Sequence, residues 1–400
     1  MGENVMAKIA FFCIPAYGHT NPTLEVVREL IKRNHEVHYY SYNMMKEKIE
    51  TTGATFISCD QYDIQMNLKP KDAQRIGKDL AFSMEVLVNT TLALDEAVME
   101  DMKKWKPDCI VGDSMATWGK LTALKLDIPF VSSTTTFAFN KESAEVMDHS
   151  LGQLLGILPA MFKANKSVKR LRDKGYPVKN ALSVISNDNN TDTIVYTSPE
   201  FQPFSESFSD KYVFVGPSIR KTEAKVVKTA QKLLYISLGT VINQNDSFYQ
   251  NCIKAFGDSD IQVIMSIGNL TEISELGEIP SNFTVKNSVD QIAVLQEADA
   301  FITHCGMNST NEALYYKVPL VLFPQTNEQK GVANRVHELG AGVFLKENTV
   351  KKIREAVRTV MEDSTYRDAA TKISEGFRRC GGFKAAADKI EQTIREGKSF

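Results

Sequence analysis

Short apolar runs alternate with amphipathic segments along this chain, which is the pattern of parallel β-sheets covered by helices. Residues 8–15 form the first apolar run, and a turn at 16–21 separates it from an amphipathic segment that begins at Pro22. This spacing predicts a strand, a loop and a helix. Further strands of the same series are predicted at 36–42, 108–112, 129–133, 194–196 and 212–215.

The alternation starts a second time near residue 232, so the sequence predicts two domains of the α/β class with parallel sheets. A glycine–proline pair and a charged run come before this point and indicate a linker. Three helices are predicted near the end of the chain, at 350–362, 366–379 and 383–395. We therefore expect an N-terminal domain over 1–216, a linker over 217–230, a C-terminal domain over 231–380 and a last helical segment over 381–400.

Residues 137–185 interrupt the alternation with a helical pattern, which Gly152, Gly156 and Pro159 are expected to break into pieces. Insertions of this kind often line a substrate pocket. Apolar walls for such a pocket are available from Phe137, Phe139, Met147, Leu154 and Met161.

Composition narrows the classes of partner. The 400 residues are 43% hydrophobic, and 47 Lys and Arg nearly balance 49 Asp and Glu without a long basic run, which argues against nucleic acid or an anionic membrane as the main partner. No apolar stretch is long enough to span a membrane and the chain shows no signal-peptide pattern, so we expect a cytoplasmic protein. The six cysteines form no C-x-x-C pair, which argues against disulfides and zinc.

His19 and Asp113 each follow a predicted strand directly, at the carboxyl ends where open parallel sheets carry their active sites. A histidine with its ordinary pKa of about 6.5 can take a proton from a hydroxyl group at neutral pH, and a carboxylate neighbour stabilises the imidazolium. The pair is therefore a candidate general base with its partner. The alternatives are a histidine hydrogen-bonded within a turn and an aspartate that caps the following helix.

The segment 299–316 has the pattern of an anion site. A short apolar run ends at His304, and Gly306 then leads into a helix whose start offers unpaired N–H groups and a positive dipole end. Ser309 adds a donor, and Glu312 falls one turn after Asn308, where a carboxylate suits a ribose diol. Ordinary helix capping, with a structural histidine and a solvated glutamate, is the alternative interpretation.

Glu328 and Gln329 follow the next predicted strand, at 319–324. A carboxylate beside an amide can bind two neighbouring hydroxyls of a sugar ring. The alternative is a surface helix capped by Asn327.

The sequence from Ser288 to Asn334, SVDQIAVLQEADAFITHCGMNSTNEALYYKVPLVLFPQTNEQKGVAN, resembles the donor-binding signature of UDP-dependent glycosyltransferases. The length of the chain and the order of its elements agree with the bacterial macrolide and flavonoid enzymes of this family. The resemblance implies a GT-B fold, with two Rossmann-like parallel-sheet domains that face a central cleft and a last helix that returns to the first domain. Plant members begin the signature with a tryptophan that stacks on uracil, where this chain has Ser288.

The resemblance also implies roles for the candidate residues. His19 matches the catalytic base and Asp113 the aspartate that orients it. Uridine is expected near Gln291 and Glu312. The phosphates are expected near Thr240, His304, Gly306 and Ser309, and the sugar end near Asn308, Glu328 and Gln329. For Thr240, a simple β-turn is the alternative.

The implied reaction is inverting transfer of a hexose, most simply glucose, from a UDP-sugar to a hydroxyl of a hydrophobic small molecule such as a macrolide or a flavonoid. No metal or other cofactor is expected. The pair Asp258 and Asp260 has a metal-binding spacing, but it precedes a predicted strand and is expected to be a turn. We expect a monomer whose partners are the UDP-sugar and the acceptor.

Two other functions are compatible with the same fold. A GT-B sugar-nucleotide epimerase would need acidic groups near the donor sugar and no apolar acceptor pocket. A non-catalytic nucleotide-sugar-binding or auxiliary protein would have no use for both His19 and Asp113.

Overall fold

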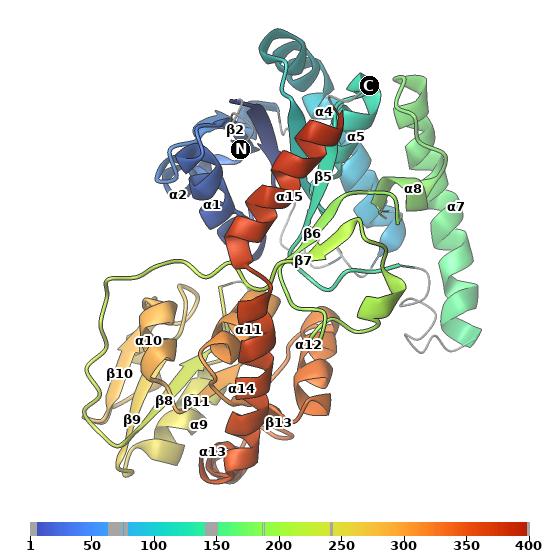
Figure 1. Ribbon diagram of the computed structural model, residues 1–400. Coiled ribbons are helices and arrows are strands. Elements are labelled where there is room, and N and C mark those ends of the chain that lie inside the picture. Colours follow the sequence, from blue (N-terminus) through green and yellow to red (C-terminus); the bar gives the residue numbers. More distant parts are fainter. Residues whose placement is uncertain are drawn as a thin grey trace. The chain divides into compact units, whose positions relative to one another are not determined.

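The computed structural model describes residues 6–62, 75, 79–140, 151–185, 187, 189–240 and 243–397, without the side chains of 62 and 151–159. The chain divides into two compact units, unit 1 with residues 1–218 and 382–400 and unit 2 with residues 219–381. The division after Ser218 places most of the expected linker in unit 2. Each unit contains one parallel sheet with helices on both faces, so the predicted α/β class is confirmed (Figure 1).

The sheet of unit 1 has seven parallel strands in the order β3-β2-β1-β4-β5-β6-β7. This is the order of a doubly wound fold, with its switch point between β1 and β4. The strands are β1 Lys8–Phe12, β2 Glu36–Ser41, β3 Thr55–Ser58, β4 Cys109–Asp113, β5 Phe130–Thr134, β6 Thr193–Val195 and β7 Tyr212–Phe214.

Helices cover both faces of this sheet. One core joins α1 and α15 to the strands, and another joins α4 and α5 to the opposite face. The helices of unit 1 are α1 Tyr17–Lys32, α2 Lys46–Glu50, α4 Leu80–Trp105, α5 Thr117–Leu126, α7 Leu151–Asp173, α8 Ala181–Ile185 and α15 Gly382–Gly397.

Two helix predictions in unit 1 were wrong. Helix α1 begins at Tyr17, so Pro22 lies inside it and His19 is in its first turn instead of a loop. The helix tolerates the proline because Val26, Val27 and Leu30 bury its apolar face. Helix α7 is continuous through Gly152, Gly156 and Pro159; it packs on α4 through a buried cluster that includes Ala164, Val168 and Leu171, and this packing offsets the cost of the helix breakers.

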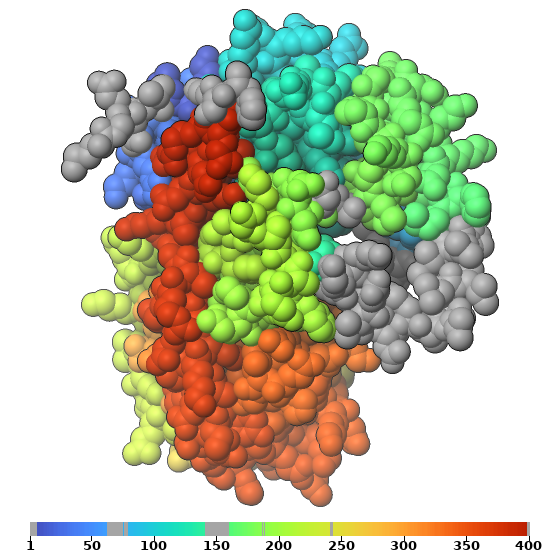
Figure 2. Space-filling view, turned by 45° about the vertical axis from the view of Figure 1, so that its right-hand side comes forward, coloured from blue at the N-terminus to red at the C-terminus, as the bar shows by residue number. Residues whose placement is uncertain are grey.

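Helix α15 is far from the rest of unit 1 in sequence but belongs to its core. Its inner face carries Ala386, Ala387, Ile390 and Ile394, which are buried with residues of β1, β2 and β4. In Figure 2 its other side lies at the surface of unit 1 (deepest red), beside the yellow-green segment around residues 200–215. Helix α15 therefore belongs to unit 1 by its packing.

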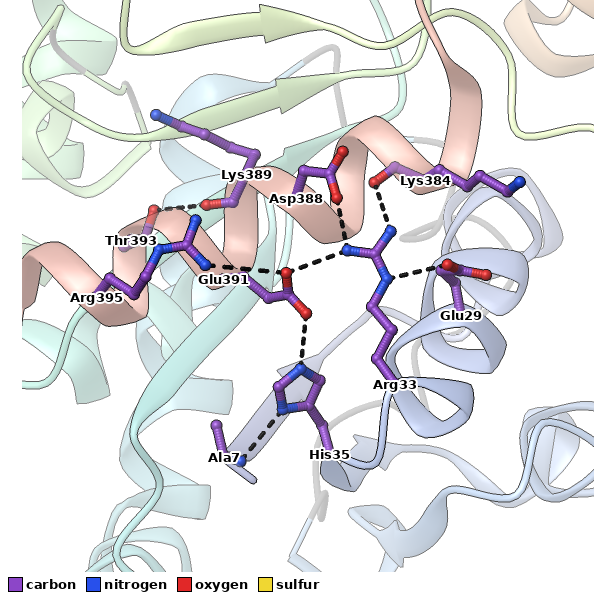
Figure 3. A network of polar contacts seen from close by, with 10 residues as sticks. All are labelled: Ala7, Glu29, Arg33, His35, Lys384, Asp388, Lys389, Glu391, Thr393 and Arg395. Carbon is purple, nitrogen blue, oxygen red and sulfur yellow. Dashed lines mark hydrogen bonds and ion pairs between the residues drawn. The ribbon is translucent and has the colours of Figure 1, made fainter. Parts of the chain in front are cut away.

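A polar network fixes α15 to the end of α1 (Figure 3). The Arg33 guanidinium contacts Glu29, Asp388 and Glu391. The His35 ring lies between the backbone N–H of Ala7 and the Glu391 carboxylate. At the middle of α15, the ammonium group of Lys389, whose side chain is 3% exposed, lies 2.7 Å from Asp192 Oδ1. The network joins the end of α1 and the start of β1 to the last helix of the chain.

The sheet of unit 2 has six parallel strands in the order β10-β9-β8-β11-β12-β13. Its strands are β8 Lys232–Ser237, β9 Ile261–Ser266, β10 Phe283–Lys286, β11 Ala300–Thr303, β12 Leu320–Leu322 and β13 Gly342–Phe344. Helices α9 and α13 pack on one face, and the helices of the unit are α9 Asp246–Phe256, α10 Gln291–Glu297, α11 Met307–Tyr315, α12 Asn327–Glu338, α13 Val350–Glu362 and α14 Ser364–Arg379.

Candidate functional site

The structure brings His19 and Asp113 together at the carboxyl edge of the unit 1 sheet. Strands β1 and β4 are neighbours, so the start of α1 lies beside the end of β4. His19 Nδ1 is 2.8 Å from Asp113 Oδ1, and the Asp113 side chain is fully buried while that of His19 is 19% exposed. Because a carboxylate only accepts, Nδ1 carries the hydrogen and Nε2 is the nitrogen that can take a proton. This is the geometry of a general base held by a carboxylate.

The alternative role of Asp113 as a helix cap was wrong. Helix α5 begins at Thr117, its N-cap is Ala116, and no side chain caps it. The Asp113 carboxylate instead points to His19, a residue 94 positions away in the sequence.

Thr135 is a contact of His19 that the sequence did not reveal. Its Oγ1 lies 3.1 Å from His19 Nδ1, and the residue is 3% exposed. Thr135 directly follows β5, the neighbour of β4, so the Nδ1–H group lies between a carboxylate and a hydroxyl. Its position at a strand end could have indicated a site residue. However, residues 132–136 are all serine or threonine, so the sequence does not show which of them contacts His19.

The expected acceptor residues have different surroundings. Phe137 is 8% exposed and its ring lies 5.7 Å from that of Phe201, so it anchors the segment after β5. Phe139 is 53% exposed, and Met161 packs partly into the α4–α7 cluster. Met147 and the side chain of Leu154 lie outside the described residues. An acceptor-binding role for these residues stays a prediction.

In unit 2, three adjacent strands bring most donor-site candidates to one edge. Ser237 of β8, Thr303 of β11 and Leu322 of β12 are in register, and the segments that follow them carry the candidates. Thr240 lies in an exposed bend after β8. His304 follows β11, and Glu328 and Gln329 lie in the first turn of α12.

The His304 ring is held between two glycines. A Cβ at Gly239 would lie 2.6 Å from the ring and a Cβ at Gly306 would lie 2.5 Å from Nε2, so any side chain at either position would clash. Gly239 also has φ +81°, which favours glycine. Gly239, His304 and Gly306 therefore pack tightly together at the ends of β8 and β11.

Desolvation lowers the pKa of His304 to about 4, although a backbone contact with Ser237 acts in the opposite direction. The ring is therefore neutral at pH 7 and has one N–H to donate. It can bind a phosphate oxygen by a hydrogen bond but contributes no positive charge.

The start of α11 fits an anion. Gly306 is the N-cap and no side-chain hydrogen bond caps the helix, whose first residue is Met307. Asn308 and Ser309 are in the first turn and partly exposed. A helix start that no side chain caps presents backbone donors and a positive dipole end to a ligand.

Gln291 holds Glu312 in place. Its Nε2 donates to Glu312 Oε2 at 2.6 Å and lies 3.2 Å from Ser309 Oγ. Its Oε1 accepts a hydrogen bond of 3.1 Å from the hydroxyl of the buried Tyr235. Desolvation raises the pKa of Glu312, and the hydrogen bond from Gln291 counteracts this shift. The amide of Gln291 is thus used within the protein, and a ligand-binding role for Glu312 stays a prediction.

Gln329 has a structural role beside any role in binding. Its Oε1 accepts from the backbone N–H groups of Gln325 and Thr326, at 2.7 and 3.2 Å, while Thr326 Oγ1 accepts from the N–H of Gln329. This capping box shows that Thr326 caps α12, so the expectation of an Asn327 cap was wrong. Glu328 is exposed in the first turn, next to this fixed amide.

Asp258 and Asp260 lie in the turn between α9 and β9, as expected. Among the described residues, no group of three or more His, Cys, Asp or Glu side chains is arranged to hold a metal ion. The described helices include none that is long and apolar enough to cross a membrane.

Known proteins resemble this chain over its whole length. Residues 250–378 match the family described as "Erythromycin biosynthesis protein CIII-like, C-terminal domain". The chain is 36% identical over 397 residues to "NDP-glycosyltransferase YjiC" of Bacillus subtilis (strain 168), with 97% of each protein covered. It is 32% identical over 401 residues to "Uncharacterized UDP-glucosyltransferase YojK" of the same organism, with 98% of each covered.

The fold agrees with these relatives. The crystal structure of CalG4, the calicheamicin glycosyltransferase, superposes with a TM-score of 0.81 at 27% identity and covers 98% of this chain and 99% of that one. Full-length identity above 30% to a named glycosyltransferase, together with two Rossmann-like sheets, confirms the resemblance found in the sequence. The chain belongs to the family of GT-B glycosyltransferases that use nucleotide-sugar donors.

Proposed function

We propose that this glycosyltransferase moves a hexose, most simply glucose, from a UDP-sugar to a hydroxyl of a hydrophobic small molecule, with inversion and without a metal. The observation that carries the proposal is the bond of 2.8 Å between His19 Nδ1 and Asp113 Oδ1. It orients a histidine whose other ring nitrogen can act as a base. A protein that only binds nucleotide sugars has no need of this arrangement.

The reaction is a single displacement. His19 Nε2 takes the proton of the acceptor hydroxyl as its oxygen attacks the anomeric carbon from the face opposite the leaving group. The new C–O bond forms while the bond to the β-phosphate oxygen breaks, and the electron pair leaves with UDP. Asp113 stabilises the imidazolium, and the proton later returns to solvent.

The leaving phosphates gain charge and need preorganised donors. His304 as a neutral donor, Ser309, Thr240 and the amides at the start of α11 are the groups we assign to them. Thr303 and Ser237 are in register, which supports this grouping because the strands β11 and β8 end side by side.

The remaining candidates are assigned to the ribose and the sugar. Glu312, held by Gln291, is placed to accept the ribose hydroxyls. Asn308, Glu328 and Gln329 are assigned to the hexose end. The relatives support a UDP-sugar donor and a small-molecule acceptor, since one is named a UDP-glucosyltransferase and another is named for calicheamicin.

Enzyme treated with a chelator is expected to keep its full rate. Hydrogen bonds from backbone amides and from neutral His304, together with the α11 dipole, stabilise the charge on the leaving pyrophosphate in place of a divalent ion. Turnover is measured after dialysis against EDTA, with and without added magnesium or manganese. Loss of activity that either ion restores would contradict the prediction and turn attention to Asp258 and Asp260.

Glu328→Ala is expected to reduce the preference for UDP-glucose over UDP-galactose. Losing one hydrogen-bond partner of a sugar hydroxyl costs about 1–3 kcal/mol, or roughly 5- to 150-fold in specificity. The ratio of kcat/KM for the two donors measures this effect. The neighbouring exposed residue Lys330 supplies the control variant Lys330→Ala, which should keep the ratio. A Glu328→Ala enzyme with full discrimination would show that other residues recognise the sugar.

TDP-glucose is expected to work beside UDP-glucose, with the uridine donor preferred. The position of the uracil-stacking tryptophan of plant enzymes is occupied here by the exposed Ser288, which leaves base recognition less strict.

Mass spectrometry of purified protein with UDP-glucose and a flavonol tests the proposed function. The expected result is a flavonol that is heavier by one hexose, together with free UDP. Conversion of UDP-glucose to another UDP-hexose without transfer would instead identify an epimerase. An unchanged mixture over several donors and acceptors would overturn the proposed substrates.

A further inference from the structure

The segment that enters unit 2 is fastened to the start of α10. Arg220 forms an ion pair with Asp290, with 2.5 Å between Nη2 and Oδ1. Thr222 Oγ1 donates a hydrogen bond of 2.7 Å to the other carboxylate oxygen, Oδ2. Asp290 is also the N-cap of α10, because Oδ1 accepts from the backbone N–H of Ala293. One carboxylate thus joins the segment at 220–222 to the first turn of a helix.

That first turn carries Gln291, the residue that holds Glu312. Gln291 directly follows Asp290, and its amide links the Tyr235 hydroxyl to the Glu312 carboxylate. A change in the position of Asp290 would therefore move the donor that orients Glu312. The chain of contacts runs from Arg220 through Asp290 and Gln291 to Glu312.

Charge connects the same residues. Glu312 is in surroundings that disfavour its ionised form, and the neighbouring charge of Asp290 adds to this effect, whereas the charge of Arg220 opposes it. Without Arg220, the Asp290 carboxylate would act on Glu312 without compensation. The ion pair therefore has an electrostatic as well as a geometric consequence.

We propose that Arg220, locked to Asp290, is a positioning residue for nucleotide recognition that keeps Glu312 an oriented acceptor for the two ribose hydroxyls. The inference rests on the ribose role proposed for Glu312. A carboxylate can accept from both hydroxyls of a ribose, whereas a 2′-deoxyribose offers only one of the two. Preference for UDP over 2′-deoxy-UDP therefore reports on the state of Glu312.

Calorimetric titration of the full chain with UDP and with 2′-deoxy-UDP tests the proposal. Wild-type protein is expected to prefer UDP by about 13- to 160-fold, the range for a hydrogen bond to a charged group. Arg220→Gln should reduce this ratio about 2- to 5-fold, as for the loss of a partly exposed charge pair. Arg220→Lys, which keeps the charge, should retain most of the preference.

The double variant Arg220→Gln/Asp290→Asn should recover the preference of the wild type. It removes both opposite charges together, and asparagine caps a helix as well as aspartate does. Lys228→Gln is the matched control. Lys228 belongs to the same segment and forms an ion pair with Asp299, with 2.5 Å between Nζ and Oδ2, but it does not contact Asp290 or Gln291 in the structure. Circular dichroism verifies that each variant is folded.

The outcomes separate the two proposals. If Arg220→Gln keeps the ratio while Glu312→Gln abolishes it, the role of Arg220 is wrong and the ribose role of Glu312 stands. If wild-type protein binds UDP and 2′-deoxy-UDP equally, the ribose role fails and the inference fails with it. The inference would also be overturned if Arg220→Gln lowered the affinities for UDP and 2′-deoxy-UDP by the same factor and the double variant did not recover them.

Discussion

Replacing His19 with alanine is expected to lower kcat for transfer to an aliphatic alcohol by about 10²- to 10⁴-fold, the usual contribution of a positioned general base. The variant lacks the only group that we assign to take the acceptor proton. The loss should be smaller with acidic phenols, because they ionise without a base. Steady-state kinetics with an alcohol and with a series of phenols of decreasing pKa measure both effects.

Binding of UDP to His19→Ala is expected to be nearly unchanged, since the residues assigned to the nucleotide are in unit 2 and His19 is in unit 1. Calorimetry provides this control. If the variant lost UDP affinity in proportion to its activity, or if acidic phenols suffered the same loss as alcohols, His19 would not be the base.

Lys389→Met is expected to destabilise unit 1 by about 3 kcal/mol, near the lower end of the cost of breaking a buried ion pair. Methionine keeps the apolar stem of the buried Lys389 but leaves Asp192 without its partner at 2.7 Å. Asp192 retains Lys211 at 3.4 Å and the hydroxyl of Thr393, which moderates the loss. Because α15 lies in the core of unit 1, weakening this contact should destabilise the sheet that carries His19 and Asp113.

Urea unfolding followed by tryptophan fluorescence measures this effect. Both tryptophans of the chain, Trp105 and Trp118, are in unit 1, so the signal reports on that unit alone. Arg395→Ala is the control, since Arg395 is 68% exposed and 4.0 Å from Glu391 and should contribute less than about 1 kcal/mol. Equal stability of Lys389→Met and wild type would show that the ion pair between Lys389 and Asp192 does not stabilise the packing of α15 on unit 1. The double variant Lys389→Met/Asp192→Asn should recover part of the loss.

The sequence predicted the positions of candidate residues correctly where a polar residue directly follows an apolar run. Buried strands such as β4 and β11 are continuous apolar runs, and a polar residue directly after such a run lies at the functional edge of a parallel sheet. This rule placed Asp113 and His304 at strand ends. The amphipathic pattern predicted helix α13 at 350–362. In the structure this helix has the same bounds, and Thr349 caps its start.

Contacts between distant segments were not accessible in this way. Thr135 and His19 are 116 positions apart, and nothing in either local sequence indicates their hydrogen bond. The amide of Gln291 is oriented by a hydrogen bond from the hydroxyl of Tyr235, and nothing in the sequence distinguishes Tyr235 from other strand residues. The continuity of α7 through Pro159 also depends on tertiary packing, which outweighs local propensity.

The anomeric configuration of the product distinguishes single displacement from a mechanism with retention. Wild-type protein is incubated with α-linked UDP-glucose and an alcohol acceptor, and proton NMR follows the anomeric signal of the first product formed. We expect a β-glucoside from wild type, and from His19→Ala the same product at a rate about 10²- to 10⁴-fold lower. An α-glucoside, or a β-glucoside that His19→Ala forms at the wild-type rate, would contradict single displacement with His19 as the base.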